Sequence, residues 1–183
     1  AVLDLAPRRG AQSTKFSRGQ VTIAGGSRGL TGAVRMSSTA AIRTGAGYAT
    51  VAVPADLEPT FEAAEVEVMS RGVGDTPGRL GLEAADELLA AIARAAPGVL
   101  GPGLGSDEDT LDLVRQVAPR IEAPLVIDAD GLNAFAGQLD RLAARKAPTV
   151  LTPHAGELGR LLEYESAEVN ARRLAGAREA AAW

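Results

Sequence analysis

Residues 21–33 read Val-Thr-Ile-Ala-Gly-Gly-Ser-Arg-Gly-Leu-Thr-Gly-Ala, a short β-branched run followed by a glycine turn and a segment of small residues. The β-branched run is typical of a buried strand. The stretch from Thr31 to Arg43 is rich in Ala and Ser and predicts a helix that can lie close to a sheet or a ligand. Strand, glycine turn and helix in this order form the repeating corner of α/β proteins.

The same alternation continues along the chain, with short apolar runs predicting strands and helical spacing predicting the helices between them. The predicted strands are residues 21–24, 48–53, 99–100, 124–128 and 149–152, and the predicted helices are residues 31–43, 55–64, 82–96, 107–117 (with Ser106 as N-cap), 139–145, 156–162 and 166–182; residues 72–81 are predicted to form a loop. We therefore expect an α/β fold with a mostly parallel central sheet and helices on both faces.

Composition narrows the function. The chain has 183 residues, 46% of them apolar, which is enough for one compact domain or most of a larger one. Its net charge of −4 disfavours non-specific binding to nucleic acid or an anionic membrane, and no apolar run approaches the roughly 20 residues of a membrane span, so we expect a cytoplasmic protein. Because cysteine is absent and His154 is the single histidine, a metal site must rest mainly on oxygen ligands, which favours Mg²⁺.

Glycine-rich or polar segments follow four of the predicted strands, at residues 25–32, 101–105, 128–133 and 152–157. In open parallel sheets, ligands bind beyond the carboxyl ends of the strands. Free N–H groups at helix starts bind anions, and carboxylates hold Mg²⁺. These segments together predict a site for a nucleotide or a phosphorylated ligand.

Each segment also has a structural interpretation. Glycine turns after strands are common, and one of Asp128 and Asp130 can cap the following turn. Asn133 can be a turn residue, and His154 can pack or cap a helix instead of meeting a ligand. The glycines of residues 101–105 are more unusual, because each costs backbone entropy, and they favour close approach of a ligand.

Three classes of function compete. Residues 22–30 look like the cofactor loop of short-chain dehydrogenases, but the Tyr-x-x-x-Lys pair of that family is missing, since Ala52 follows Tyr48 and Glu168 follows Tyr164 at the required spacing. No acidic residue ends the second strand to bind a ribose. A small-molecule kinase of the ribokinase-like class and a nucleotide-binding module without turnover remain as alternatives.

The motifs taken together are more specific than any one of them. In order they are Ala-Gly-Gly-Ser-x-x-Leu-Thr-Gly-Ala at 24–33, Ala-Ile-Arg-Thr-Gly-Ala-Gly at 41–47, Gly-Pro-Gly-Leu-Gly at 101–105, Asp-Ala-Asp-Gly-Leu-Asn at 128–133 and Leu-Thr-Pro-His-Ala-Gly-Glu at 151–157. From about Lys15 to Trp183 the chain closely resembles the ADP/ATP-dependent NAD(P)H-hydrate dehydratases, a branch of the ribokinase-like superfamily. The resemblance implies a three-layer α/β/α fold.

The resemblance also implies an activity, in which NAD(P)H with a hydrated nicotinamide ring is repaired. ADP (or ATP), with Mg²⁺, phosphorylates the ring hydroxyl, and elimination restores NAD(P)H with release of phosphate and AMP. Phosphate is a far better leaving group than hydroxide, so coupling to the nucleotide makes the dehydration run forward. Family members assemble as homo-oligomers and are often fused to an epimerase domain.

Site residues follow from the resemblance position by position. The residues that match contacts to hydrated NADH or NADPH are Ala33, Gly103, Gly105 and His154; those that match polar positions near the phosphates and Mg²⁺ are Asp128, Asn133 and Glu157. No residue is assigned as a metal ligand.

One departure from the family bears on the domain boundaries. The family's later strand with a Lys-Gly pair, and its Gly-Ser/Thr-Gly-Asp motif, do not occur in the sequence, so we expect the catalytic base to lie beyond Trp183. Residues 15–183 are then the N-terminal two-thirds of a dehydratase domain, whose C-terminal part is missing from this chain. Residues 1–14 are a linker or leader, with Leu3 to Arg9 similar to the linker that follows the epimerase domain.

Overall fold

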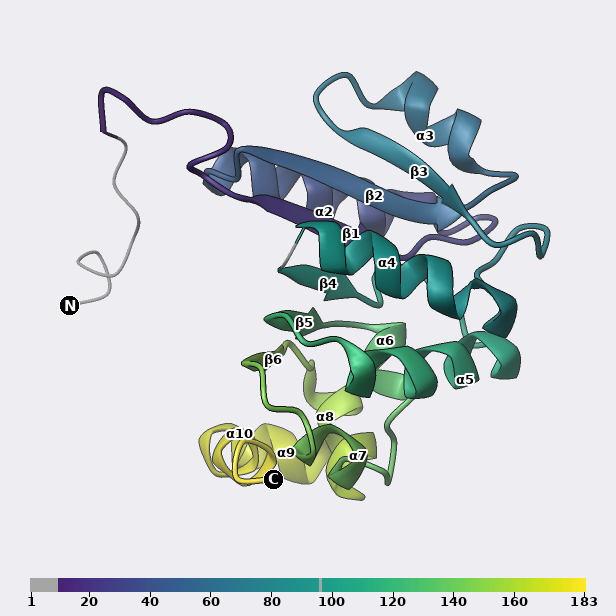
Figure 1. Cartoon of the computed structure of the whole chain (residues 1–183). Coiled ribbons are helices and arrows are strands. Elements are labelled where there is room, and N and C mark those ends of the chain that lie inside the picture. Colours follow the sequence, from purple (N-terminus) through teal and green to yellow (C-terminus); the bar gives the residue numbers. More distant parts are fainter. Residues whose placement is uncertain (1–9, 96) are drawn as a thin grey trace.

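The computed structural model describes residues 10–95 and 97–183, and its centre is a six-stranded sheet of order β3-β2-β1-β4-β5-β6 (Figure 1). The strands are β1 (Gln20–Ala24), β2 (Tyr48–Pro54), β3 (Met69–Val73), β4 (Gly98–Leu100), β5 (Leu125–Ile127) and β6 (Thr149–Leu151). Every neighbouring pair is parallel. The predicted parallel α/β architecture is confirmed.

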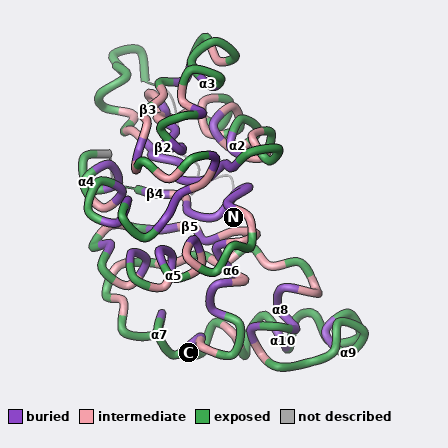
Figure 2. Tube along the Cα trace, turned by 90° about the vertical axis from the view of Figure 1, so that its right-hand side faces the viewer, coloured by how far each residue is buried: buried purple, intermediate pink, exposed green. Residues whose placement is uncertain are grey.

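Helices follow most of the strands, and three of them come after β6. They are α2 (Thr31–Thr44), α3 (Glu58–Ala64), α4 (Ala85–Ala95), α5 (Glu108–Val117), α6 (Asp130–Asn133), α7 (Asp140–Ala143), α8 (Ala155–Leu162), α9 (Ser166–Ala171) and α10 (Arg173–Ala180), with 3₁₀ turns at Leu82–Ala84 and Ala118–Arg120. The tube coloured by burial shows buried residues concentrated along the strands and on the inner sides of the helices (Figure 2).

Two apolar cores lie on opposite faces of the sheet, because successive residues of a strand point to opposite sides. Ile23 of β1 packs in a cluster with Val34 of α2 and Phe61 of α3. Its neighbour Ala24 belongs to a larger cluster that includes residues of α4 and α5. Helices therefore cover both faces, as a three-layer fold requires.

The strand order places a topological switch point between β1 and β4. From β1 the chain proceeds outward to β2 and β3, and then returns to β4 on the other side of β1. The loops that leave β1 and β4 run in opposite directions at this point, and a crevice between such loops is where ligands of open α/β sheets bind.

Strand β3 is not predicted from the sequence, and the loop predicted at residues 72–81 begins inside it. This strand reads Met-Ser-Arg-Gly-Val, and Val73 is its one buried residue. It is an edge strand paired with β2 alone, so it needs no continuous apolar run. Its sequence therefore carries no strand signal.

Several helix boundaries also differ from prediction. The N-cap of α5 is Asp107, not Ser106, because the Asp107 carboxylate accepts a hydrogen bond from the backbone N–H of Asp109. The helix predicted at 166–182 is two helices, separated at Arg172, whose φ of −135° and ψ of 40° are not helical. The helix predicted at 139–145 is the single turn α7, and the short α6 is not predicted from the sequence.

The similarity of Leu3 to Arg9 to an inter-domain linker lies outside the described residues. Within residues 10–95 and 97–183, no helix is both long and apolar enough to cross a bilayer.

Candidate functional site

The loops that follow β1 and β4 are in direct backbone contact. The N–H of Gly26 donates to the carbonyl of Pro102 at 2.9 Å, and the N–H of Gly101 donates to that of Ala24 at 3.1 Å. A Cβ on Gly25 would lie 2.2 Å from the Pro102 oxygen. Glycine is thus required in the first loop by the close approach of the second.

The glycines of residues 101–105 contact loops on both sides. A Cβ on Gly101 would lie 1.8 Å from the carbonyl oxygen of Asp128, and one on Gly103 would lie 2.3 Å from that of Leu30. The sequence favours close approach of a ligand as the reason for these glycines. The structure gives a second reason at Gly101 and Gly103, because neighbouring backbone already occupies the space of a side chain.

Side chains hold this loop at both ends. The hydroxyl of the buried Ser27 donates to the carbonyl of Gly103 at 3.0 Å. The N–H of Gly105 donates to Oδ2 of Asp130 at 2.9 Å. The loop after β4 is therefore fixed to the loop after β1 and to the first residue of α6.

The loops after β5 and β6 are joined in the same way. The Thr152 hydroxyl donates to Oδ1 of Asp128 at 2.7 Å. Asn133 donates from Nδ2 to Oδ1 of Asp130 at 3.4 Å and accepts at Oδ1 from Nη1 of Arg160 at 3.0 Å. Both the oxygen and the nitrogen of the Asn133 amide thus have protein partners, which favours a structural role for this residue.

His154 is the N-cap of α8. Its Nδ1 accepts from the N–H groups of Gly156 and Glu157 at 3.0 and 3.3 Å, and Oε2 of Glu157 accepts from the His154 N–H at 2.8 Å. The His154 side chain is 68% exposed, whereas that of Glu157 is 9% exposed. The imidazole can therefore meet a ligand while it caps the helix, but the Glu157 carboxylate is directed at the backbone.

The start of α2 differs from the starts of α5 and α8. It has no side-chain cap and no acidic residue in its first turn. In the part of the chain that the structure describes, the N–H groups of Gly32, Ala33 and Gly103 have no hydrogen-bond partner. Uncapped helix N-termini attract anions, and this one adjoins Gly103 through the contact with Leu30.

A fifth loop, between β3 and α4, completes this edge. The N–H of Arg28 donates to the carbonyl of Gly78 at 2.7 Å. Next to Gly78, Nη1 of Arg79 lies 2.6 Å from Oδ2 of Asp109 in the first turn of α5. The hydrogen bond from Arg79 lowers the pKa of the Asp109 carboxyl below its ordinary value.

The structure therefore brings the predicted site residues to one edge of the sheet. Ala33 and Gly103 lie at the switch point, since the residue that precedes α2 touches Gly103. His154 follows β6, two strands from β4, a separation of about 10 Å at ordinary strand spacing. Asp128 lies between them and is tied to the loop of His154 through Thr152.

The oxygen-rich residues at this edge do not form a protein cage for a metal ion. Among the described residues, no three His, Asp or Glu side chains are grouped as metal ligands would be. Asp128, Asp130 and Glu157 each use at least one carboxylate oxygen in a hydrogen bond within the chain. The donor set fits an ion that takes most of its ligands from phosphate and water, as Mg²⁺ commonly does.

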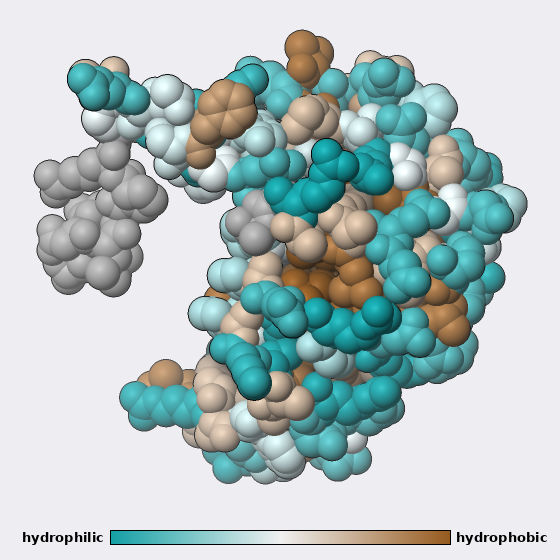
Figure 3. All heavy atoms as spheres, in the orientation of Figure 1, coloured by the Kyte–Doolittle hydropathy of each residue, from teal (hydrophilic) through white to brown (hydrophobic). Residues whose placement is uncertain are grey.

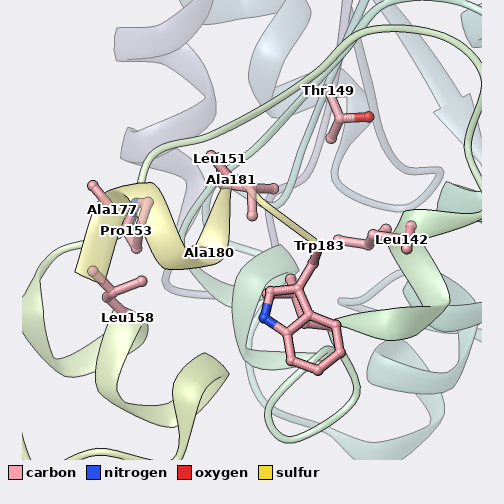
Figure 4. A pocket seen from close by; sticks show the side chains of 11 residues that line it. Leu142, Thr149, Leu151, Pro153, Leu158, Ala177, Ala180, Ala181 and Trp183 are labelled. Atoms are coloured by element: carbon pink, nitrogen blue, oxygen red, sulfur yellow. The ribbon is translucent and has the colours of Figure 1, made fainter. Parts of the chain in front are cut away.

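Two apolar cavities lie elsewhere. One, of about 280 Å³, lies at the outer edge of β6, where Leu142, Leu151 and Trp183 are among its lining (Figure 4). The other lies beside α4, where apolar side chains gather on the surface and Leu89, Ala93 and Ile121 line a groove (Figure 3). The second is lined by no residue of the loops after β1, β4, β5 or β6, whereas Pro153, next to His154, contributes to the lining of the first.

Comparison with known proteins identifies the family. A family model described as NAD(P)H-hydrate dehydratase matches residues 21–182. The bifunctional NAD(P)H-hydrate repair enzyme of Moorella thermoacetica is 42% identical over 169 residues, covering 92% of this chain and 32% of that protein. The ADP-dependent (S)-NAD(P)H-hydrate dehydratase of Xanthomonas campestris is 34% identical, covering 93% of this chain and 57% of that protein. The chain thus spans about a third and just over half of these relatives.

Solved structures agree on the fold. A ribokinase-like superfamily protein from Enterococcus faecalis has a TM-score of 0.76 at 27% identity, covering 96% of this chain and 58% of that one. The ADP/ATP-dependent NAD(P)H-hydrate dehydratase of Bacillus subtilis, at 24% identity, has a TM-score of 0.71, with 91% of this chain and 55% of that one covered. The expected ribokinase-like fold is confirmed. On the extent of the family match, the chain belongs to the NAD(P)H-hydrate dehydratase family.

Proposed function

We propose that the protein containing this chain restores NAD(P)H from its hydrated form in an ADP-dependent reaction that releases phosphate and AMP. The observation that carries this proposal is the family match over residues 21–182, which includes all the loops of the candidate edge. Matching relatives bear dehydratase and repair names, so the ribokinase-like kinase and the binding module without turnover are not favoured.

The hydrated dinucleotide binds across the switch point in this proposal. Its phosphates approach the uncapped start of α2, where Ala33 offers a backbone N–H and where Leu30, just before the helix, touches Gly103. Gly105, two residues after Gly103, belongs to the same loop and is held by its hydrogen bond to Asp130. The exposed imidazole of His154, two strands away, meets the far part of the ligand.

ADP supplies the phosphoryl group, with ATP as the other candidate donor. Transfer to the ring hydroxyl forms the O–P bond and breaks the bond between the β-phosphorus and AMP. Loss of a ring proton and of phosphate then forms the carbon–carbon double bond of NAD(P)H. Asp128, Asn133 and Glu157 lie on the edge of the sheet proposed to bind these phosphates, and Mg²⁺ bound with the nucleotide would neutralise their charge.

The base that removes the ring proton is assigned to sequence beyond Trp183. In the proposal, residues 15–183 are the N-terminal two-thirds of a dehydratase domain; the coverage of only 57% of the Xanthomonas campestris dehydratase supports a domain longer than this stretch. The similarity to bifunctional repair enzymes supports fusion to an epimerase domain that acts on the same hydrated dinucleotides, with residues 1–14 as the linker. We propose a homo-oligomer on the family resemblance.

The test uses the intact protein with hydrated NADH, ADP and Mg²⁺, and follows the absorbance of NADH together with AMP and phosphate. NADH, AMP and phosphate should appear in equal amounts, and none should appear without ADP. Phosphate that stays on a stable alcohol would indicate a kinase instead. Tight ADP binding in calorimetry without any product would leave a binding module.

A further inference from the structure

Asp130, which is not among the site residues assigned from the family resemblance, holds the loop of residues 101–105 in place. Its Oδ2 accepts the N–H of Gly105 at 2.9 Å, although 25 residues separate the two in sequence. The other carboxylate oxygen accepts from the amide of Asn133. A hydrogen bond to a carboxylate is stronger than one to a neutral oxygen.

The loop needs such a contact because of its own composition. Gly103 and Gly105 have φ values of +68° and +86°, which only glycine adopts freely. A segment with that freedom samples many conformations unless its neighbours restrain it. Ser27 binds the carbonyl of Gly103, and Asp130 binds the N–H of Gly105. The peptide groups on either side of Leu104 therefore keep one orientation before a ligand arrives.

Asp130 is itself held in position. It follows Ala129, whose φ of 51° and ψ of −121° are strained for a residue with a Cβ. This turn is closed by a hydrogen bond from the N–H of Gly131 to the carbonyl of Asp128 at 3.0 Å. The strained backbone carries Asp130 away from the strand direction of Asp128, so that two neighbouring carboxylates serve different loops.

A relay of side chains extends from Asp130 to α8. Nδ2 of Asn133 donates to Asp130, and Oδ1 of Asn133 accepts from Arg160 at 3.0 Å. Arg160 lies on the helix whose N-cap is His154. The relay therefore connects the loop of Gly103 and Gly105 with the helix that presents the imidazole.

We propose that Asp130 is a positioning residue of the dehydratase reaction, which fixes the Gly103–Gly105 backbone, and with it the spacing to His154, for the hydrated dinucleotide. This rests on the proposed function. Loss of the Asp130 carboxylate should weaken binding of the hydrated dinucleotide, because part of the binding free energy must then order the loop.

The hydrogen-bond pattern provides a sharp test by side-chain exchange. In Asp130→Asn the new amide oxygen can accept from Gly105, but its NH₂ group faces the NH₂ group of Asn133. Asn133 cannot turn its amide without losing the bond from Arg160. The double substitution Asp130→Asn with Asn133→Asp restores every bond, because the new carboxylate at 133 accepts from both neighbours.

Steady-state kinetics of the intact protein at saturating ADP and Mg²⁺ should rank the variants by their KM for hydrated NADH. Asp130→Ala should raise KM for hydrated NADH about tenfold or more and change kcat less, as expected for loss of a hydrogen bond to a charged group. Asp130→Asn should fall between, and the double variant should return KM to within about threefold of wild type. Asp86→Ala, which removes a carboxylate 91% exposed on α4, is the matched control and should leave KM unchanged.

Amide hydrogen exchange without substrate separates this inference from the proposed function. Exchange at Gly105 should be faster in Asp130→Ala and slow again in the double variant. If the wild-type protein is inactive, the proposed function is wrong. The exchange result still shows whether Asp130 restrains the loop. Unchanged exchange in Asp130→Ala, or a double variant with a KM as high as that of Asp130→Ala in an active protein, would overturn the inference.

Discussion

His154 and Glu157 cap the start of α8 reciprocally. Nδ1 of His154 accepts from the N–H of Glu157, the carboxylate of Glu157 accepts from the N–H of His154, and Nε2 of His154 lies 3.2 Å from Oε1 of Glu157. The imidazole therefore acts as the hydrogen-bond acceptor of a helix cap through Nδ1. His154, a candidate substrate-binding residue, is thus also a structural residue of the helix.

Substitution of His154 should separate these two roles. His154→Ala removes the cap and should lower the free energy of unfolding by about 1 kcal/mol, as measured by urea denaturation. His154→Asn retains a capping oxygen and should keep most of that stability. If the imidazole contacts the hydrated dinucleotide, both variants should bind it more weakly in calorimetry. Full affinity in His154→Asn would leave the histidine with its capping role alone.

Ala129 predicts an unusual response to glycine. In a helix interior, Ala→Gly costs up to about 1 kcal/mol, and exposed Ala90 of α4 should show this cost. At Ala129 the positive φ strains the Cβ, so Ala129→Gly should leave the free energy of unfolding unchanged or raise it by up to about 1 kcal/mol. Urea denaturation of both variants measures the difference. A loss at position 129 as large as that at position 90 would show that the turn carries no strain.

The family resemblance and the simple strand signals predict the architecture well, for a physical reason. The first strand of the sheet is central and buried, and residues such as Ile23 reveal it through β-branched hydrophobicity. Strand β3 escapes prediction because an edge strand with one buried residue has little to distinguish it from a loop. The break at Arg172 escapes as well, since both halves of that segment have good helix formers.

The candidate site is predicted in its location more than in its contacts. The glycines of residues 101–105 indicate a crowded loop, but not that the carbonyls of Asp128 and Leu30 cause part of the crowding. The spacing Asp-Ala-Asp places two carboxylates at a strand end without indicating which one turns toward Gly105. That choice depends on the positive φ of Ala129, and alanine gives no sequence signal for such a conformation.

Arg79 and Asp109 predict a pH dependence of stability. The hydrogen bond from Arg79 lowers the pKa of Asp109 below its ordinary value of 3.8. A carboxyl with a depressed pKa in the folded state contributes stability above its unfolded pKa, and this contribution is lost as the pH falls through the folded pKa. With side chains 31% and 40% exposed, the pair is worth at most about 1 kcal/mol.

Arg79→Met should therefore lower the free energy of unfolding near neutral pH, and the difference from wild type should shrink as the pH falls below 3.8. Asp107, which lies 3.3 Å from the same guanidinium, contributes to the neutral-pH difference. Chemical denaturation at a series of pH values measures it. A difference that stays constant down to acid pH would mean that packing of the Arg79 side chain, and not its charge, stabilises the start of α5.

The contact of Gly103 with Leu30 predicts that two glycines of similar conformation differ in their tolerance of alanine. Gly103 and Gly29 have φ values of +68° and +84°, so a Cβ is strained at both, by about 1–2 kcal/mol. At Gly29 a Cβ would meet nothing within 4 Å, whereas at Gly103 it would lie 2.3 Å from the Leu30 carbonyl oxygen. Gly103→Ala should therefore cost about 1–3 kcal/mol more than Gly29→Ala.

Gly103→Ala should also weaken binding of the ligand. Leu30 is the N-cap of α2, and its displacement moves the N–H groups of Gly32 and Ala33. Urea denaturation of the two variants measures the stability difference, and calorimetry with hydrated NADH measures the affinity. Gly29→Ala should retain more affinity than Gly103→Ala. Equal costs in both measurements would mean that the loop relaxes away from α2 without consequence, and that the close approach of the two backbones does not define the site.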